Sequence, residues 1–339
     1  MCLYPRLIEN RKYKPNKKNG GNAPPVKDHR TTFVPIGCQK CIECKNQKAR
    51  EWQTRLQEDI KENRNGKFIT LTYSEEALKA FSDTITRFKE IEYYKLQNEI
   101  ATMSMRLFLE RWRKKYKKSI RHWMVTEIGG KHTERLHMHG IMWTDHPEEI
   151  EKIWQYGWVW RGYEEEEKGK YKNYVNAKTI NYIIKYVTKS DEKHPDYKSI
   201  ILTSPGIGDR YTKKGDYRNN KYNGKETDET YRLPTGQKMA LPIYWRNKIY
   251  TDEEKEKLWL KKLDDGYRYI CGEKVHGVER ETYYNLLDYH RRRSRKLGYQ
   301  EPELKWSKAG YEEMQRRMNE EQQLIKSGQI QANAPSAGS

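Results

Sequence analysis

Two neighbouring segments with alternating apolar side chains constrain the fold of this chain more than any other feature. Residues 123–128 (WMVTEI) end at Gly129-Gly130, and residues 135–143 (RLHMHGIMW) begin a few positions later. Apolar and β-branched residues bounded by glycine are typical of strands. The polar sequence KHTE lies between the two segments and favours a turn. We therefore predict two strands that pair antiparallel across residues 129–134.

The second of these strands carries a histidine pair. His137 and His139 flank Met138, so both imidazoles point to one face of the strand while Met138 points to the other. Two neutral imidazole nitrogens a few ångströms apart suit a divalent metal. Antiparallel pairing brings Glu127 near them, and such a set leaves coordination positions open for phosphate oxygens. We interpret Glu127, His137 and His139 as metal ligands; a histidine pair without a ligand role is the alternative.

Other segments complete a mixed α/β pattern. Further strands are expected at 67–73 (KFITLTY) and 156–160. Segments with helical periodicity are 46–62, 86–118 (as one helix or a broken one) and 179–189. The acidic run 164–167 is expected to be a solvated loop, and 204–240 to be mostly irregular.

The segment 179–189 (TINYIIKYVTK) places tyrosines at helical spacing. As a helix it has an apolar stripe formed by Ile180, Ile183, Ile184 and Val187. Tyr182, Lys185, Tyr186 and Lys189 then share the opposite face, and the two tyrosine Cβ atoms lie about 5–6 Å apart. Two phenolic oxygens so placed can reach one phosphate site in turn, and neighbouring ammonium groups favour the phenolate. A merely solvated Tyr/Lys face is the alternative.

Three closely spaced cysteines form a second metal candidate. Cys38, Cys41 and Cys44 have two-residue spacings, and Cys2 can supply a fourth ligand. Four thiolates suit a structural, tetrahedral Zn²⁺. An iron–sulfur cluster and free thiols with packing roles are the alternatives. Cys271 is treated as an ordinary thiol.

The charge balance indicates a polyanionic partner. The 339 residues include 67 Lys and Arg against 48 Asp and Glu, a net charge of +19. Such an excess favours nucleic acid binding. No apolar run approaches the roughly 20 residues of a membrane span. The N-terminus also lacks an apolar signal core, so we expect a protein of a reducing cytoplasm.

Several of these motifs, in their order along the chain, resemble a known family. RLHMHGIMW resembles the His-hydrophobe-His signature of HUH endonucleases, and KFITLTY resembles the first strand motif of rolling-circle initiators. NYIIKYVTK is similar to the two-tyrosine motif of Microviridae initiators. The segments MCLYP, GCQKCIEC, VTEIG and LPIYWRNKIY resemble the gokushovirus-type replication initiator of bacteriophages. The resemblance covers residues 1–250.

The resemblance implies a fold and a reaction. The fold is α+β, with an antiparallel sheet, helices on one side and the histidine strand central. The reaction is site-specific nicking and joining of single-stranded origin DNA, through a covalent 5′-phosphotyrosine, that initiates rolling-circle replication. On these residues, His137, His139 and Glu127 hold Mg²⁺ or Mn²⁺, and Tyr186 and Tyr182 are the nucleophiles. Lys189 and Lys185 stabilise charge.

The same resemblance implies partners and a location. A host DNA polymerase extends the free 3′ hydroxyl, a host helicase is expected to assist, and the location is the cytoplasm of a host bacterium. The absence of a G-x-x-x-x-G-K-[ST] loop agrees with a reaction that needs no ATP.

Two other functions compete with this interpretation. A non-catalytic single-stranded nucleic-acid-binding protein explains the charge and the aromatics but not the ordered Glu, His and Tyr set. A plasmid relaxase or transposase of the same superfamily keeps the chemistry and changes the biology. Formation of a covalent protein–DNA adduct separates an enzyme from a binding protein.

Composition shifts divide the chain into five regions. These are an N-terminal basic and cysteine-cluster region (1–62), an HUH endonuclease core (63–195), an irregular basic extension (196–250), a charged helical region (251–326) and a disordered tail (327–339).

Overall fold

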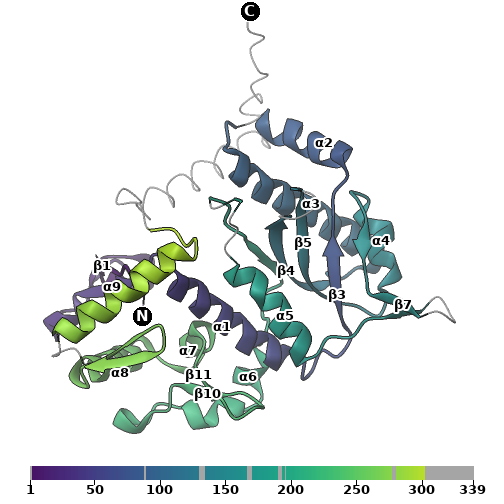
Figure 1. Ribbon diagram of the computed structural model, residues 1–339. Coiled ribbons are helices and arrows are strands. Elements are labelled where there is room, and N and C mark those ends of the chain that lie inside the picture. Colours follow the sequence, from purple (N-terminus) through teal and green to yellow (C-terminus); the bar gives the residue numbers. More distant parts are fainter. Residues whose placement is uncertain are drawn as a thin grey trace, which may run out of the picture. The chain divides into compact units, whose positions relative to one another are not determined.

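The computed structural model describes residues 2–87, 89–129, 134–165, 170–189, 193–194, 196–276 and 280–301 (Figure 1). These residues form a mixed α+β structure with a five-stranded antiparallel sheet, which confirms the predicted fold class. The chain divides into two compact units of discontinuous segments. Unit 1 contains the described residues of Met1–Gly66, Tyr174–Pro195 and Thr203–Glu301, and unit 2 contains those of Lys67–Asn173 and Asp196–Leu202. The five-region division of the sequence stays a prediction.

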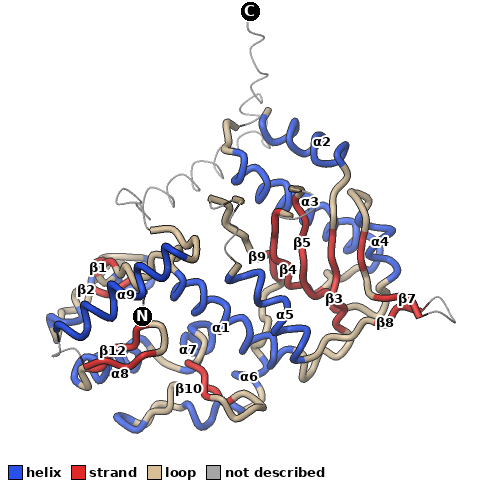
Figure 2. Tube along the Cα trace, viewed as in Figure 1, coloured by secondary structure: helices blue, strands red, loops and turns tan. Residues whose placement is uncertain are grey.

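Unit 2 is built on the five-stranded sheet, in the spatial order β6-β3-β5-β4-β9 (Figure 2). Its strands are β3 (Gly66–Leu71), β4 (Arg121–Ile128), β5 (Leu136–Trp143), β6 (Val159–Trp160) and β9 (Ile201–Thr203). The four predicted strands are thus confirmed, although β6 is only two residues long.

The β4–β5 hairpin has the register that the alternation predicts. Glu127 lies opposite His137, and Val125 lies opposite His139. Directly opposed residues share a face, so Glu127 and both histidines point the same way. Gly140 lies opposite Met124, and a Cβ added at Gly140 would stand 2.7 Å from the Met124 Cα atom. Glycine is therefore required beside His139 for the two strands to approach each other.

The other face of the hairpin is buried against helices. Leu136, Met138 and Met142 are 0–1% exposed. They share a core cluster with Phe108 of α3 (Tyr93–Tyr116). The helix predicted within 86–118 is thus confirmed, and it backs the strand that carries the histidines.

Two helices of unit 2 have no counterpart in the sequence prediction. They are α2 (Glu75–Thr86) and α4 (Glu148–Trp154). The Ser74 hydroxyl caps α2 by accepting a hydrogen bond from the Ala77 N–H at 3.2 Å. Phe81 and Ile85, four residues apart, are both buried. A cap followed by an i, i+4 apolar pair is a helix-start signal that the sequence already contained.

The acidic run corrects one prediction. Glu164 and Glu165 belong to β7 (Tyr163–Glu165), which pairs antiparallel with β8 (Lys170–Lys172). The expected solvated loop is therefore wrong for these two residues, and residues 166–167 lie outside the described part. Tyr163 and Tyr171 belong to a residue type that is enriched in strands, a signal that the run of acidic residues outweighed in the sequence prediction.

Unit 1 combines helices with three two-stranded hairpins. Its helices are α1 (Ile42–Asp59), α5 (Ala177–Thr188), α6 (Arg210–Lys213), α7 (Ile243–Ile249), α8 (Asp252–Asp264) and α9 (Arg280–Lys296). Its hairpins are β1 (Arg6–Glu9) with β2 (Phe33–Ile36), β10 (Thr230–Arg232) with β11 (Lys238–Ala240), and β12 (Tyr267–Ile270) with β13 (Glu273–His276). Helices α1 and α5 pack against each other, and they confirm the helices predicted at 46–62 and 179–189.

The C-terminal region is less helical than predicted. The hairpin β12–β13 separates α8 from α9. Its turn contains Cys271 and Gly272 with φ of 49° and 95°, and two consecutive left-handed residues make the turn that matches strand twist. Residues 302–326 and the tail 327–339 lie outside the described part. Among the described helices, none is both long and apolar enough to cross a membrane.

Candidate active site and metal centres

Glu127, His137 and His139 converge at one point above the sheet of unit 2. The Glu127 Oε2 atom lies 3.2 Å from His137 Nε2 and 3.0 Å from His139 Nε2. Two donors at neighbouring positions of an octahedral cation, each bonded at about 2.1 Å, are separated by about 3.0 Å. The side chains of Glu127, His137 and His139 are 13%, 20% and 12% exposed, so the donors are held in place and yet reachable. This donor set therefore fits a divalent cation with open coordination positions.

The second ring nitrogen of each histidine has its own partner. The His137 Nδ1 atom lies 3.0 Å from the Arg135 carbonyl, which can only accept, so Nδ1 carries the proton and Nε2 offers its lone pair. The His139 Nδ1 atom lies 2.9 Å from the Thr70 hydroxyl on β3. The Phe68 ring stacks on His139 with ring centroids 6.3 Å apart. These contacts fix the orientation of both imidazoles, as around metal-ligating histidines.

The predicted tyrosine pair lies on α5 of unit 1. Asn176 and Thr179 form a capping box at its start. The apolar stripe is buried, as predicted: Ile180, Ile183, Ile184 and Val187. The Asn181 side chain accepts a hydrogen bond from Gln53 of α1 at 2.8 Å, which fixes the rotation of the helix.

The two phenol groups of α5 contact each other. The Tyr182 and Tyr186 hydroxyl oxygens are 2.8 Å apart, and their ring centroids are 5.6 Å apart. Tyr182 is 48% exposed. The Lys185 Nζ atom lies 5.9 Å from the centroid of the Tyr182 ring. The exposed Lys189 follows the helix as its C-cap residue. The shared Tyr/Lys face is thus a property of the fold.

Sequence reasoning missed one contact of this helix. The Tyr299 hydroxyl donates a hydrogen bond to the Thr188 carbonyl at 2.9 Å and satisfies an open carbonyl at the end of α5. No local signal in the sequence joins residues 111 positions apart. The structure brings the metal ligands together in unit 2 and the tyrosines together in unit 1.

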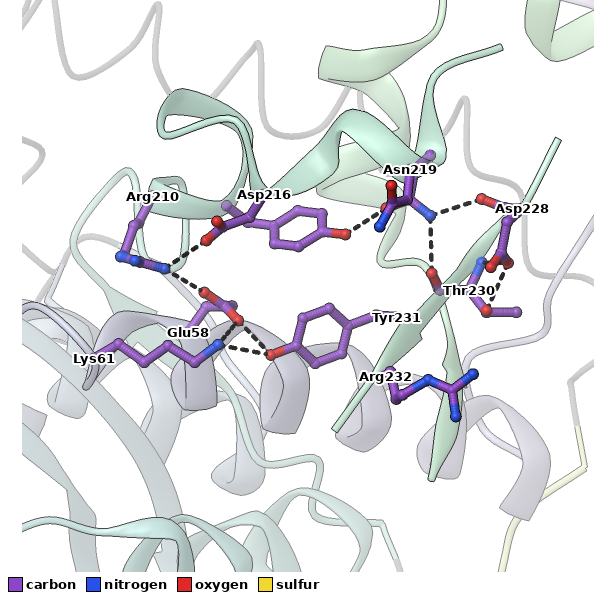
Figure 3. Close-up of a pocket in the computed structure, with 11 residues that line it drawn as sticks. Glu58, Lys61, Arg210, Asp216, Asn219, Asp228, Thr230, Tyr231 and Arg232 are labelled. Atoms are coloured by element: carbon purple, nitrogen blue, oxygen red, sulfur yellow. Dashed lines mark hydrogen bonds and ion pairs between the residues drawn. The ribbon is translucent and has the colours of Figure 1, made fainter. Parts of the chain in front are cut away.

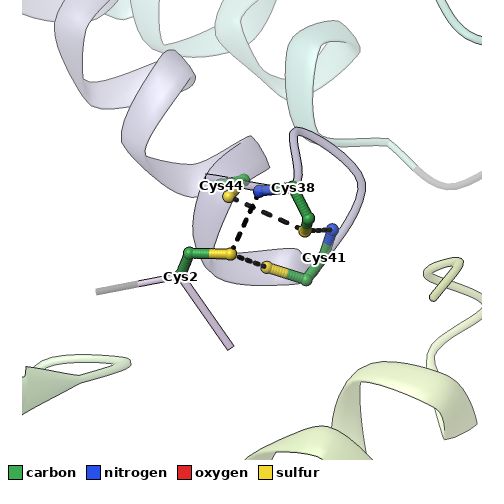
Figure 4. A group of neighbouring side chains, drawn as sticks. All are labelled: Cys2, Cys38, Cys41 and Cys44. Carbon is green, nitrogen blue, oxygen red and sulfur yellow. Dashed lines mark hydrogen bonds between the residues drawn. The ribbon is translucent and has the colours of Figure 1, made fainter. Parts of the chain in front are cut away.

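The four cysteines of unit 1 form a compact cluster (Figure 4). Their Sγ atoms lie within 4.8 Å of one another, with Cys2–Cys41 and Cys38–Cys44 each at 3.9 Å. A tetrahedron of sulfurs around Zn²⁺, with bonds of about 2.3 Å, has edges of about 3.8 Å. None of the four forms a disulfide. The cluster therefore fits a tetrahedral thiolate site, and Cys2 is its fourth member, as predicted.

Hydrogen bonds favour thiolates in this cluster. The Cys38 N–H donates to the Cys2 Sγ atom at 3.2 Å, and the Cys41 N–H donates to the Cys38 Sγ atom at 3.3 Å. Hydrogen bonding with the Cys2 thiol lowers the pKa of Cys41 to about 7 and holds that of Cys38 well below its usual range. Thiolates are the form in which cysteines bind metals.

One comparison with known proteins bears on the candidate active site. Residues 66–191 match the family model of replication-associated proteins of the ORF2 type. This segment is similar to replication-associated proteins. It spans less than half of the chain but includes the three metal ligands and both tyrosines. The match supports a role in the initiation of replication. Neither the curated proteins nor the solved structures contain a match to this chain.

A cavity of about 530 Å³ in unit 1 has a different character (Figure 3). Glu58, 1% exposed, accepts hydrogen bonds from the Tyr231 hydroxyl and the Lys61 ammonium group. Its Oε2 atom lies 3.1 Å from Arg210, which also pairs with Asp216 at 2.7 Å. These charged groups bind one another, so we interpret the cavity wall as a network that holds residues 210–232 on α1.

Proposed function

We propose that this protein nicks and joins single-stranded DNA at a specific origin and thereby initiates rolling-circle replication of a circular phage genome. The supporting observation is the Glu127, His137 and His139 donor set, with its oriented imidazoles, inside a segment that is similar to replication-associated proteins. A basic chain of net charge +19 suits a polyanionic substrate.

The three donors would hold Mg²⁺ or Mn²⁺. Two imidazoles and one carboxylate are compatible with Mn²⁺, and the open positions suit the phosphate and water ligands that Mg²⁺ keeps. A cation held there would polarise the scissile phosphate and neutralise charge that develops on it. The protein's part is to hold the donors rigidly, which the Arg135 and Thr70 contacts do.

The nucleophile is the phenolic oxygen of Tyr186 or Tyr182. Its attack forms an O–P bond to the scissile phosphate and breaks the bond to the 3′ oxygen, which takes up the proton that the tyrosine loses. The 5′ phosphate stays on the tyrosine, and reversal of the step rejoins a strand. One phosphodiester replaces another, so ATP is not needed. The hydrogen bond between the two hydroxyls lets either phenol stabilise the other as a phenolate.

Lysines of the same helix face supply positive charge. Lys185 lies beside the Tyr182 ring, and Lys189 is exposed at the end of α5. In this proposal they offset the charge of the phosphate and of the attacking phenolate. The partners are single-stranded origin DNA, a host polymerase that extends the free 3′ hydroxyl and a host helicase, in the cytoplasm of a bacterial host.

The cysteine cluster, in the same proposal, holds a structural Zn²⁺. Four thiols leave no coordination position for a substrate, which is the arrangement of structural rather than catalytic zinc. Its chemistry is limited to stabilising the fold.

The test is formation of a covalent adduct. Purified protein is incubated with 5′- or 3′-labelled single-stranded phage origin DNA and Mn²⁺ and then analysed on a denaturing gel. The expected result is a shifted species that carries the label of the 5′-phosphate fragment and disappears with chelator. A protein that binds this DNA but never forms the species would be a non-catalytic binding protein.

A further inference from the structure

The hairpin β12–β13 of unit 1 has one face with exposed aromatic side chains. Its cross-strand register pairs Tyr267 with His276 and Tyr269 with Lys274, and opposed residues share a face. We call these four residues the tyrosine face. Tyr267 is 45% and Tyr269 54% exposed.

The opposite face of this hairpin is firmly anchored. Ile270 is 0% and Val275 5% exposed, and both pack in a cluster with Leu287 of α9 and with the metal-candidate cysteines. The Glu273 carboxylate accepts a hydrogen bond at 2.8 Å from the His290 ring, which is 2% exposed. A rigidly backed hairpin presents its outer side chains in fixed positions, so the exposed tyrosines are not a by-product of fraying.

The tyrosine face combines aromatic rings with positive charge. The Lys274 Nζ atom lies 3.7 Å from the centroid of the Tyr267 ring, and the His276 ring meets the same ring edge-on at 4.8 Å. None of its four members is a carboxylate, and Glu273 points to the other side of the hairpin. Two residues separated by one position on a strand lie about 7 Å apart. Unpaired nucleotides can place successive bases at such a spacing on a sheet surface.

We propose that the tyrosine face binds single-stranded nucleic acid, with bases stacked on Tyr267 and Tyr269 and a phosphate held by Lys274. Exposed aromatic rings with interleaved cations are the features that recognise single strands without sequence preference. The inference rests on the proposed function insofar as the bound strand is the one that is cut. It adds a binding surface that lies outside residues 66–191, the segment similar to replication-associated proteins.

The test measures affinity separately from cleavage. Fluorescence anisotropy with a labelled oligothymidine is compared for wild type, Tyr267→Ser/Tyr269→Ser and Tyr267→Phe/Tyr269→Phe, in chelator. We expect the serine variant to bind at least about 5-fold more weakly and the phenylalanine variant to bind like wild type, because stacking needs the ring. Affinity for duplex DNA should not change, since paired bases cannot stack on the protein. Lys274→Gln should lower the salt slope by about 0.7.

The matched control is Tyr93→Ser. Tyr93 is 57% exposed at the start of α3 in unit 2, and its loss should leave affinity unchanged. Circular dichroism checks that each variant folds. A serine variant that is folded and binds oligothymidine as tightly as wild type would overturn the proposal, as would an equal loss in the phenylalanine variant. Failure of wild type to form a covalent adduct would instead refute the proposed nicking activity and leave this measurement interpretable.

Discussion

The two candidate metal-binding histidines are oriented by different kinds of partner. A backbone carbonyl holds His137, whereas a side-chain hydroxyl from another strand, that of Thr70, holds His139. A carbonyl cannot be removed by mutation, but a hydroxyl can. The site therefore allows separate tests of the ligands and of their support.

Loss of either imidazole should abolish cleavage without abolishing DNA binding. His137→Ala and His139→Ala remove one of three donors, and we expect the nicking rate to fall at least about 100-fold. Binding persists because it is distributed over many Lys and Arg residues. Nicking is measured on labelled origin DNA, and binding by anisotropy. His146→Ala, at a half-exposed position away from the donor set, is the control and should nick normally. Undiminished nicking by both variants, or by wild type in chelator, would remove the metal site from the proposal.

Thr70 should act through metal affinity rather than through chemistry. Thr70→Val keeps the shape of the side chain and removes the hydroxyl beside His139 Nδ1. We expect an apparent Mn²⁺ affinity roughly 10-fold lower, with nicking restored at high Mn²⁺, because such supporting contacts tune ligand orientation. Titration of nicking activity with Mn²⁺ measures this. Thr72→Val is the matched control, since the Thr72 hydroxyl donates to the Trp158 carbonyl instead. An unchanged Mn²⁺ titration for Thr70→Val would show that the backbone alone positions His139.

At the scale of elements, alternation and helical spacing predicted what neighbouring residues determine. The β4–β5 register follows from side chains that alternate and from a short connection, so the sequence alone places Glu127 near His137 and His139. The stripe of α5 follows from its 3.6-residue period in the same way. The hairpin β12–β13 was missed because charged residues surround it, and its inner apolar residues, Ile270 and Val275, are buried only through distant segments.

Helix α5 leads to a prediction about its two phenols. A nucleophile that has cut once stays joined to the 5′ end, so a second cleavage needs another free hydroxyl. We expect Tyr182→Phe and Tyr186→Phe each to retain single-step adduct formation, while the double variant forms none. Both single variants should fail in multiple-round production of DNA circles, measured with a circular template and polymerase. Tyr174→Phe, another exposed tyrosine of unit 1, is the control. If one of the two is dispensable for continuous circle production, the two-nucleophile mechanism is wrong and that residue belongs to a solvated helix face.

At the scale of the whole molecule, unit 1 is assembled from three separate stretches of the chain. Its N-terminal residues reach α9, where the Arg291 guanidinium donates to the Leu3 carbonyl at 3.0 Å. The sequence could nominate Cys2 as a fourth ligand by residue type, but not the packing of Leu287 and Ile270 beside the cysteines, because those residues are far apart along the chain. Long-range closure of this kind depends on tertiary packing, which periodicity does not encode.

Because the cysteine cluster lies where the N-terminal residues meet α9 and its hairpin, its metal should stabilise residues far from it in sequence. We expect about one zinc per chain by elemental analysis, and Cys38→Ser or Cys41→Ser should lose it and lower the free energy of unfolding by at least about 2 kcal/mol. Limited proteolysis should then cut first in the N-terminal residues and in β12–β13, whose inner face packs on the cluster, while the sheet of unit 2 resists. Cys271→Ser is the control, because Cys271 is outside the four-sulfur group. Purified protein that contains neither zinc nor iron would refute a metal-bound cluster. Cleavage that begins instead in the unit 2 sheet would mean that the cluster does not hold the separate stretches of unit 1 together.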